Sequence, residues 1–378
     1  MADKKIALGQ VFRNRRERSR VNLPILSVTM SSGLVRRDTL DRKNDTNLEC
    51  DEHLLVRTGD IAYNTMRMWQ GAFGLAQEDG IVSPAYVVLA PTDRVDSLFA
   101  SYLFKTPRML HLFWSYSYGL TDDRLRLYFK DFAEIKIFLP ERKEQERIGE
   151  ILAACDQHIQ MVETRIRASR RLKAGLMQKL LSGTAREGVA PWAMEPVLLG
   201  ELFTERTEAD RCDLALLSIT ADRGVVPRMS EEYAVGSDLH QYKRIAVGDI
   251  GYNTMRMWQG VSALSEHEGI VSPAYTVCIP GSKIDGRFAA YMFKYRPVVN
   301  QLFRYSQGLV DDTRNLKFRH FAEVPVAIPT LATQRRVSEV LNAVDRDTVL
   351  LERYRNTLHC QRIALMQGLL SMPIADSR

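Results

Sequence analysis

The chain has 378 residues, of which 45% are hydrophobic and 26% charged, with a formal net charge of +6. This length exceeds one ordinary core, so two domains are expected. No apolar run approaches the roughly 20 residues that cross a bilayer, the N-terminus lacks a signal-peptide pattern, and the five cysteines form no C-x-x-C pair. We therefore expect a soluble cytoplasmic protein with reduced thiols, whose modest positive charge suits a polyanionic partner without requiring one.

The first part of the chain alternates short strand-like runs with helical stretches. Segments rich in β-branched and aromatic residues, bordered by turn residues, predict four strands: Leu23–Met30, Gly59–Asn64, Ile81–Pro91 and Ile135–Pro140. A helical stretch, Asp96–Thr106, lies between them. Residues 1–140 are therefore predicted to form a mixed α/β domain.

Residues 141–183 are predicted to form one long helix. Apolar residues recur there at alternating spacings of four and three, which is typical of a coiled-coil seam. About 40 residues at a rise of 1.5 Å would give a rod of roughly 60 Å. The seam consists of Ile148, Leu152, Cys155, Ile159, Val162, Ile166, Leu176 and Leu180.

The remainder of the chain repeats this plan. GDIAYNTMRMWQG at Gly59 returns as GDIGYNTMRMWQG at Gly248, and the same spacing of 189 residues relates LMQ-x-LLS at Leu176 to Leu365. A linker over residues 184–197 leads to a second domain over residues 198–329, and a second long helix with a C-terminal tail occupies residues 330–378. The second seam is predicted at Val337, Leu341, Val344, Leu351, Leu358, Leu365 and Leu369, with the polar Thr348, Arg355 and Arg362 in the remaining slots.

A duplication this long predicts a fused pseudo-dimer. The expected fold is α/β: two tandem mixed α/β domains, each followed by a long helix. The two helices are expected to pair as an antiparallel coiled coil with pseudo-two-fold symmetry and a domain at each end.

No shared catalytic set is found in the two halves. All seven histidines face a different residue type in the other copy, and the phosphate-binding and nucleophile-elbow motifs are absent. The carboxylate pairs Asp122-Asp123 and Asp311-Asp312 recur, and such pairs can hold Mg²⁺ for nuclease chemistry. A capping or turn role is the alternative that we favour for them. Glu134 and Lys136 form an E-x-K that resembles half of a nuclease motif. The second half of the chain does not repeat it, so we discount it as a catalytic site.

Two repeated segments have the residue types of a DNA-reading surface. Asn, Arg and Gln side chains hydrogen-bond base edges, whereas Tyr, Met and Trp suit either stacking or core packing. The first segment and its copy place these types at Tyr63, Asn64, Thr65, Arg67, Gln70, Tyr252, Asn253, Thr254, Arg256 and Gln259. The second interleaves cations with aromatics, as a phosphate-contacting or merely solvated basic face would, at Tyr118, Arg124, Arg126, Lys130, Arg314, Lys317 and Arg319.

Taken together, the duplicated segments resemble the DNA-specificity subunit of type I restriction-modification systems. The resemblance rests on GD-I-x-YN-x-M-R-x-WQG with SPAY, on F-A-E-I-x-I-x-L-P, and on E-Q-E-R-I leading into a helix that ends L-M-Q-K-L-L-S-G. The second half departs at Thr333-Gln334, where the first has Glu144-Gln145. The resemblance covers essentially the whole chain.

The resemblance implies two target-recognition domains that read a split DNA site, with the rods acting as a ruler and docking two methyltransferase subunits. Through these, a restriction or translocating subunit would join. The chain itself would bind no cofactor or metal; S-adenosylmethionine, ATP and Mg²⁺ would belong to the partners. The docking positions assigned on the rods are Gln145, Ile148, Leu152, Ile159, Gln334, Val337 and Leu341.

Because the two domains share their most distinctive segments, we expect the half-sites to form an interrupted near-palindrome. Two alternatives remain open. One is a duplicated nuclease that uses the carboxylate pairs; a methyltransferase would instead need an Asn-Pro-Pro-[Tyr/Phe] motif, which is absent. The other is a scaffold that does not bind DNA.

Overall fold

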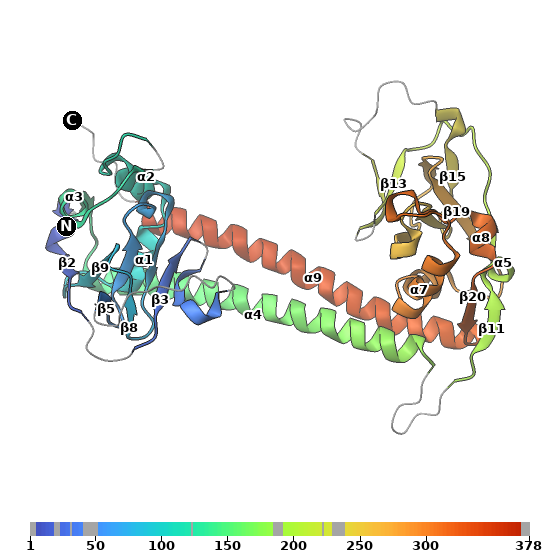
Figure 1. Ribbon diagram of the computed structural model, residues 1–378, viewed down its shortest axis with the longest axis horizontal. Coiled ribbons are helices and arrows are strands. Elements are labelled where there is room, and N and C mark those ends of the chain that lie inside the picture. Colours follow the sequence, from blue (N-terminus) through green and yellow to red (C-terminus); the bar gives the residue numbers. More distant parts are fainter. Residues whose placement is uncertain are drawn as a thin grey trace. The chain divides into compact units, whose positions relative to one another are not determined.

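The computed structural model describes residues 5–18, 23–30, 32–40, 52–121, 124–183, 192–220, 223–228 and 239–371. Within it the chain forms two compact units (Figure 1). Unit 1 comprises Met1–Glu163 and Arg353–Arg378, and unit 2 comprises Thr164–Glu352. Each unit therefore combines one globular domain with part of both long helices.

Each globular domain is built on a four-stranded antiparallel sheet. In unit 1 its order is β2 (Phe12–Arg15), β9 (Tyr86–Pro91), β6 (Ile61–Asn64) and β7 (Phe73–Leu75). In unit 2 it is β12 (Phe203–Glu205), β19 (Tyr275–Pro280), β16 (Ile250–Asn253) and β17 (Ser262–Leu264). Both faces of the inner strands are buried: in unit 1, Ile61 and Tyr63 of β6 belong to one core cluster, and Ala62 belongs to a second.

Three two-stranded antiparallel pairs accompany each sheet. In unit 1 they are β1 (Lys5–Ala7) with β10 (Lys136–Phe138), β3 (Leu26–Thr29) with β4 (Gly33–Arg36), and β5 (Leu54–Val56) with β8 (Gly80–Val82). In unit 2 they are β11 (Glu195–Leu198) with β20 (Pro325–Ile328), β13 (Leu217–Thr220) with β14 (Gly224–Pro227), and β15 (Lys243–Ile245) with β18 (Gly269–Val271).

Two sequence expectations need correction here. The strand expected over Ile81–Pro91 is divided into β8 and β9, because Ser83 closes a turn around Pro84, with the Tyr86 amide donating to the Ser83 carbonyl at 3.0 Å. Residues Glu195–Val197, which we assigned to the linker, form part of β11 and pair with β20. Their partner lies more than a hundred residues away, so no local pattern indicates the pairing.

The equivalent helices α1 and α6 each begin at an aspartate cap. Asp96 accepts from the Phe99 amide at 2.7 Å and starts α1, and Asp285 does the same for α6. The helices of unit 1 before the rod are α1 (Ser97–Leu103), α2 (Pro107–Ser115) and α3 (Phe129–Glu134). Those of unit 2 are α5 (Leu199–Leu202), α6 (Gly286–Met292), α7 (Arg296–Tyr305) and α8 (Phe318–Ala322). The rods are α4 (Arg142–Leu181) and α9 (Leu331–Leu370).

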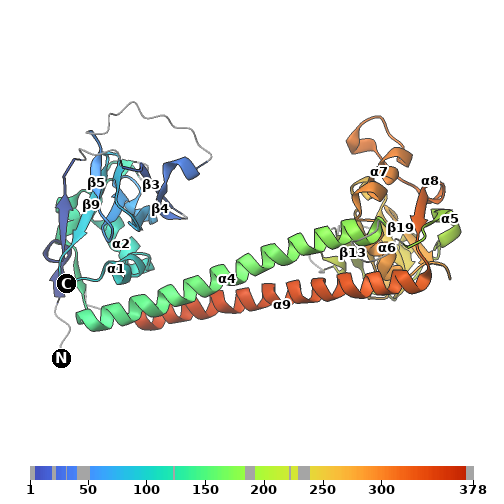
Figure 2. The same cartoon turned by 90° about the horizontal axis from the view of Figure 1, so that it is seen from below.

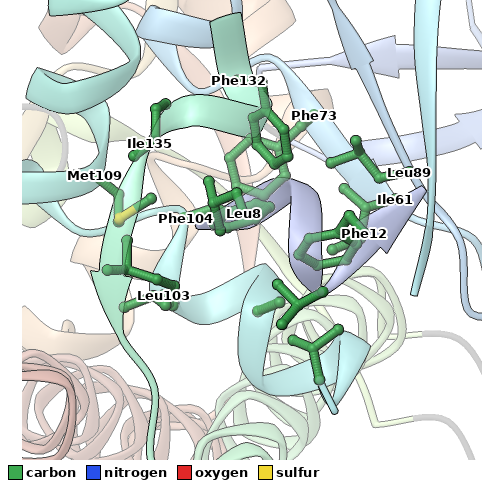
Figure 3. Close-up of a cluster of buried hydrophobic side chains, with 14 of the residues drawn as sticks. Leu8, Phe12, Ile61, Phe73, Leu89, Leu103, Phe104, Met109, Phe132 and Ile135 are labelled. Atoms are coloured by element: carbon green, nitrogen blue, oxygen red, sulfur yellow. The ribbon is translucent and has the colours of Figure 1, made fainter. Parts of the chain in front are cut away.

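Aromatic rings lie at the centre of each domain, and Figure 3 shows those of unit 1 among aliphatic side chains. In unit 1 the ring of Phe132 lies 5.8 Å from both Tyr63 and Phe104 and 6.1 Å from Phe12, measured between centroids. Phe321 has the same position in unit 2, 5.2 Å from Tyr252. The core of unit 1 also takes in the end of α9, and the core of unit 2 takes in the end of α4.

The rods pair antiparallel, as predicted, within each unit (Figure 2). In unit 1, Asp156 of α4 pairs with Arg362 of α9; in unit 2, Lys173 of α4 lies 2.6 Å from Asp345 of α9. Residues early in one helix thus lie beside residues late in the other, as in an antiparallel pair. Leu365, expected in the seam, is 36% exposed, and the neighbouring Met366 packs against the core instead. An ideal helix drifts about 20° per heptad relative to a strict 3.5-residue repeat, so a seam extrapolated along the whole rod loses register.

A repeated polar junction ties each domain to both helices. The Tyr102 hydroxyl donates to Asp156 at 2.8 Å, and the same carboxylate pairs with Arg362. In unit 2 the Tyr291 hydroxyl donates to Asp345 at 2.8 Å, where Lys173 supplies the cation. Burial, together with the neighbouring carboxylate, raises the pKa of both tyrosines. Each junction thus links a domain to its own long helix and, through the shared carboxylate, to the long helix of the other half.

A buried ion pair closes the edge of each sheet. The Arg15 guanidinium donates to Asp60 at 2.7 Å. Asp60 also accepts from the Arg57 amide at 2.9 Å, and the Asp60 side chain is only 2% exposed.

Breaking the buried pair of Arg15 and Asp60 from one side leaves an uncompensated charge. We expect Asp60→Ala to lower the free energy of unfolding by about 3 kcal/mol in urea denaturation. Glu78→Ala removes the partner of Arg36 in an exposed pair and should leave the denaturation midpoint unchanged, so equal losses in both variants would contradict the prediction.

Candidate nucleic-acid interface

A rigid turn joins the inner strand β6 to the edge strand β7. The Asn64 side chain accepts from the Met66 amide at 3.0 Å, and the Trp69 indole donates to the Met66 carbonyl at 3.2 Å. A short 3₁₀ helix, Met68–Gln70, ends at Gly71, whose φ of 88° favours glycine. Its copy in unit 2 has the same bonds, from Met255 to Asn253 at 3.0 Å and from Trp258 to Met255 at 2.8 Å.

The structure separates the members of this turn into buried and exposed groups. Met68 is fully buried, whereas Met66 is 41% exposed, so the apolar residues split between the two roles that the sequence left open. Arg67 and Gln70 are exposed. In the copy, Arg256 and Gln259 are exposed likewise. Each turn therefore presents an arginine and a glutamine from a fixed backbone.

Of the other residues that we assigned to DNA contact, the two tyrosines are buried, whereas the asparagines and threonines are half-buried and make hydrogen bonds within the fold. Tyr63 and Tyr252 are fully buried in the cores, and desolvation raises the pKa of each phenol. They do not reach the surface in the described structure. The Thr65 hydroxyl donates to the Ala85 carbonyl at 3.3 Å, and Asn64 fastens the turn as described above. Asn253 and Thr254 do the same in unit 2.

The second predicted segment lies beside the first. Tyr118 and Arg126 exchange two backbone hydrogen bonds, of 3.0 and 2.9 Å, and the following Leu127 amide donates to the Thr65 carbonyl at 2.9 Å. In unit 2 the Leu316 amide donates to the Thr254 carbonyl at 2.8 Å. Tyr118, Arg124, Arg126 and Lys130 are exposed, as are Lys317 and Arg319. The two segments, separate in sequence, thus form one surface in each unit.

Arg314 is an exception among the predicted cations. Its guanidinium lies 4.1 Å from the ring centroid of Phe303 and 5.9 Å from that of Trp258, and its side chain is only 16% exposed. These cation–π contacts hold the second segment against α7 and the turn. Unit 1 has the buried Leu125 at this position. Arg314 is therefore engaged within unit 2.

A basic cleft opens next to the turn in unit 1. Its volume is about 860 Å³, and Thr65, Met66, Tyr86 and Tyr128 form part of its wall. Its cations are Arg16, Arg18, Arg126 and Lys130; no acidic side chain of the described residues forms an ion pair with any of the four. A second hollow of about 620 Å³ is lined by Asn64, Arg67 and Tyr86 among others, and so shares Tyr86 with the first. The turn thus contributes residues to the walls of two hollows that carry positive charge.

Sequence reasoning missed Arg16 and Arg18 as site residues. They belong to RNRRERSR, residues 13–20, whose density of arginines could have signalled them. The neighbouring Arg15 differs because it is taken by Asp60 and Glu17. Only the fold separates the bound arginine from the two that face the cleft.

The candidate catalytic groups are placed as follows. Asp311 begins a 3₁₀ turn, Asp311–Thr313, and lies 3.5 Å from Arg314, which fits the turn interpretation. Asp122 and Asp123 lie outside the described residues, as does the side chain of Asp312. Among the described residues, Asp210, Cys212 and His240 bring three donor atoms within 4.8 Å on the surface of unit 2, with His240 directly paired to Asp210. None of these sets has a counterpart described in both units.

The seven predicted docking positions on the rods are buried. The Gln145 amide donates to the carbonyls of Arg94 and Pro140 at 3.1 and 2.8 Å, and Gln334 repeats this with Lys283 and Pro329. These glutamines are 1% and 0% exposed. The apolar members, all below 9% exposed, are Ile148, Leu152, Ile159, Val337 and Leu341. Their side chains are used inside the chain, so a docking partner would have to touch other faces of the helices.

Comparison with known proteins agrees with this architecture. Residues 5–168 match the family of type I restriction modification DNA specificity domains. The crystal structure of an HsdS subunit from M. genitalium is 15% identical, with a TM-score of 0.60 over 98% of this chain and 96% of that chain. The HsdS subunit from Thermoanaerobacter tengcongensis is also 15% identical, with a TM-score of 0.52 over 97% and 96%.

The matched family describes the first half of the chain, and the second half repeats that half in sequence and in fold. The chain thus matches the type I restriction modification DNA specificity domain over residues 5–168 and shares its overall fold with the two subunit structures. No helix in the described part of the chain is long and apolar enough to span a membrane.

Proposed function

We propose that this chain reads a bipartite, near-palindromic DNA site for a type I restriction-modification complex and performs no catalysis itself. The observation that carries the proposal is the repeated rigid turn, which presents Arg67 and Gln70 in unit 1 and Arg256 and Gln259 in unit 2. Arginine and glutamine are the side chains that pair bidentately with guanine and adenine edges in the major groove. A pre-formed turn presents them with little ordering cost.

The near-palindrome follows from the repetition of the reading groups. DNA has local two-fold axes perpendicular to its helix, so two similar readers related by such an axis meet inverted half-sites. The turns are identical at twelve of thirteen positions between Gly59–Gly71 and Gly248–Gly260. The half-sites should therefore share bases where the turns make contact. The divergent segments that would distinguish them are residues 36–56 and 226–246, of which 41–51 and 229–238 lie outside the described residues.

Partners would dock on the outer faces of α4 and α9. Several apolar side chains there are exposed: Met161, Leu172, Val349, Leu350, Tyr354 and Ile363. Exposed apolar side chains at helical spacing suit contact with partner helices. We assign this surface to methyltransferase subunits, two per chain by the duplication, and through them to a restriction or translocase subunit. S-adenosylmethionine, ATP and Mg²⁺ would be bound by those subunits, in the cytoplasm where chromosomal DNA is accessible.

The test is long-read methylome sequencing of cells that express this chain with the methyltransferase encoded beside it. The control is the same methyltransferase alone. A new split motif that requires this chain is the expected result, and its two halves should be inverted relatives. Unrelated halves would overturn the near-palindrome. If no motif appears from a soluble complex, a scaffold becomes the better explanation, and DNA cleavage lost on Asp311→Ala would instead indicate a nuclease.

A further inference from the structure

The two globular domains differ in charge along one segment, just after Arg15 and Arg206, where their backbones follow the same path. Arg15 and Arg206 pair with Asp60 and Asp249 in the same way, at 2.7 and 2.6 Å. Three residues after each arginine the chain forms an isolated antiparallel bridge, Arg18 with Leu54 in unit 1 and Ala209 with Lys243 in unit 2. The path of the chain along this wall of the cleft is therefore the same in both units.

The side chains on this wall are not the same. Where unit 1 has Arg16 and Arg18, unit 2 has Thr207 and Ala209. Where unit 1 has the neutral Asn14 and Leu54, unit 2 has Glu205 and Lys243. These two form an internal pair at 3.6 Å, and the Lys243 ammonium also donates to the Tyr275 carbonyl at 3.0 Å. Tyr275 is the repeat of Tyr86, which lines the basic cleft in unit 1.

The opposite wall carries two cations in each unit, so the difference in charge lies on the first wall. Arg126 of unit 1 is replaced by Asn315, Tyr128 by Lys317, and Lys130 is retained as Arg319. The basic cleft of unit 1 thus carries four cations without a described acidic partner. Its repeat in unit 2 keeps Lys317 and Arg319, while Lys243 is neutralised by Glu205.

We propose that the basic cleft of unit 1 is the stronger phosphate-binding site of the two domains, and that Arg16 and Arg18 supply the difference. This inference rests on the proposed function, because it assigns the ligand as the DNA backbone. Phosphate contacts position a protein on DNA and carry no base information, so unequal clefts are compatible with similar half-sites. Unit 1 anchors the complex electrostatically, and unit 2 depends more on base contacts.

The experiment measures how affinity depends on salt. The chain is assembled with its methyltransferase subunits, and binding to a fluorescent duplex carrying the mapped site is followed by anisotropy between 50 and 200 mM salt. Each phosphate contact contributes about 0.9 to the slope of log K against log salt. Arg16→Ala with Arg18→Ala should reduce the magnitude of the slope by roughly 2. Thr207→Arg with Ala209→Arg, which copies unit 1 into unit 2, should increase it.

The matched control removes two exposed cations of unit 1 outside the cleft, by Arg94→Ala with Lys136→Ala, and should leave the slope unchanged. An unchanged slope in the Arg16/Arg18 variant, or an equal fall in the control, overturns the inference while the proposed function stands. The unit 2 variant tests the same idea through an expected increase in the slope. It therefore still gives a result if the Arg16/Arg18 variant fails to fold. Failure of the wild-type complex to prefer the site over unrelated DNA would overturn the proposed function itself.

Discussion

Replacing Arg67 by alanine is expected to weaken binding of the complex to its site about 10- to 100-fold and to relax one base pair in one half-site. The physical reason is the loss of a bidentate contact to a base edge, worth about 1–3 kcal/mol of discrimination. Asn64 and Trp69 brace the turn without using the Arg67 side chain, so the variant should fold. Methylome sequencing of cells expressing the variant reports which position of the motif becomes degenerate.

The repeat supplies an internal comparison for this prediction. Arg256→Ala should relax the corresponding position of the other half-site and leave the first intact. Arg94→Ala, which removes an exposed cation away from the turn, should alter neither. If Arg67→Ala weakens methylation uniformly at all sites and no position of the motif becomes degenerate, the side chain contacts phosphate and the reading role assigned to it is wrong.

Replacing Phe132 by alanine is expected to destabilise unit 1 by about 3–5 kcal/mol, because it empties the centre of an aromatic core. The ring packs against those of Phe12, Tyr63, Phe104 and Phe113, with centroid distances between 5.8 and 6.1 Å. The neighbouring rings also pack against one another, so they cannot move into the cavity without breaking those contacts. Hydrogen exchange with mass spectrometry should show lost protection in β6 and α2 while β16 and α7 keep theirs.

Phe321→Ala should give the mirror result in unit 2, since Phe321 contacts Phe203, Tyr252 and Phe293 in the same way. Leu120→Ala removes an equally apolar residue that is 95% exposed and should leave protection unchanged in both units. Loss of protection throughout the chain in either phenylalanine variant would mean that the two units unfold together.

The sequence alone determined the organisation of the chain. The constant spacing of 189 residues between Gly59 and Gly248 establishes two copies of one plan, and the heptad-like apolar spacing after Pro140 predicts a long helix. It also marked the two repeated segments that we propose contact DNA. These features are legible because a repeat, a helical period and a capping residue are local properties of the chain.

Only the tertiary structure decided which members of those segments face outward. Tyr63 and Arg67 stand four residues apart in one motif, yet the first lies in the core and the second is exposed. Likewise Arg15 is bound by Asp60, whereas Arg16 faces the basic cleft. Each outcome depends on a partner distant in sequence, such as Phe132 for Tyr63, and residue type does not specify that partner. The same reason hid the pairing of β11 with β20 and the place of Met366 in the core of unit 1.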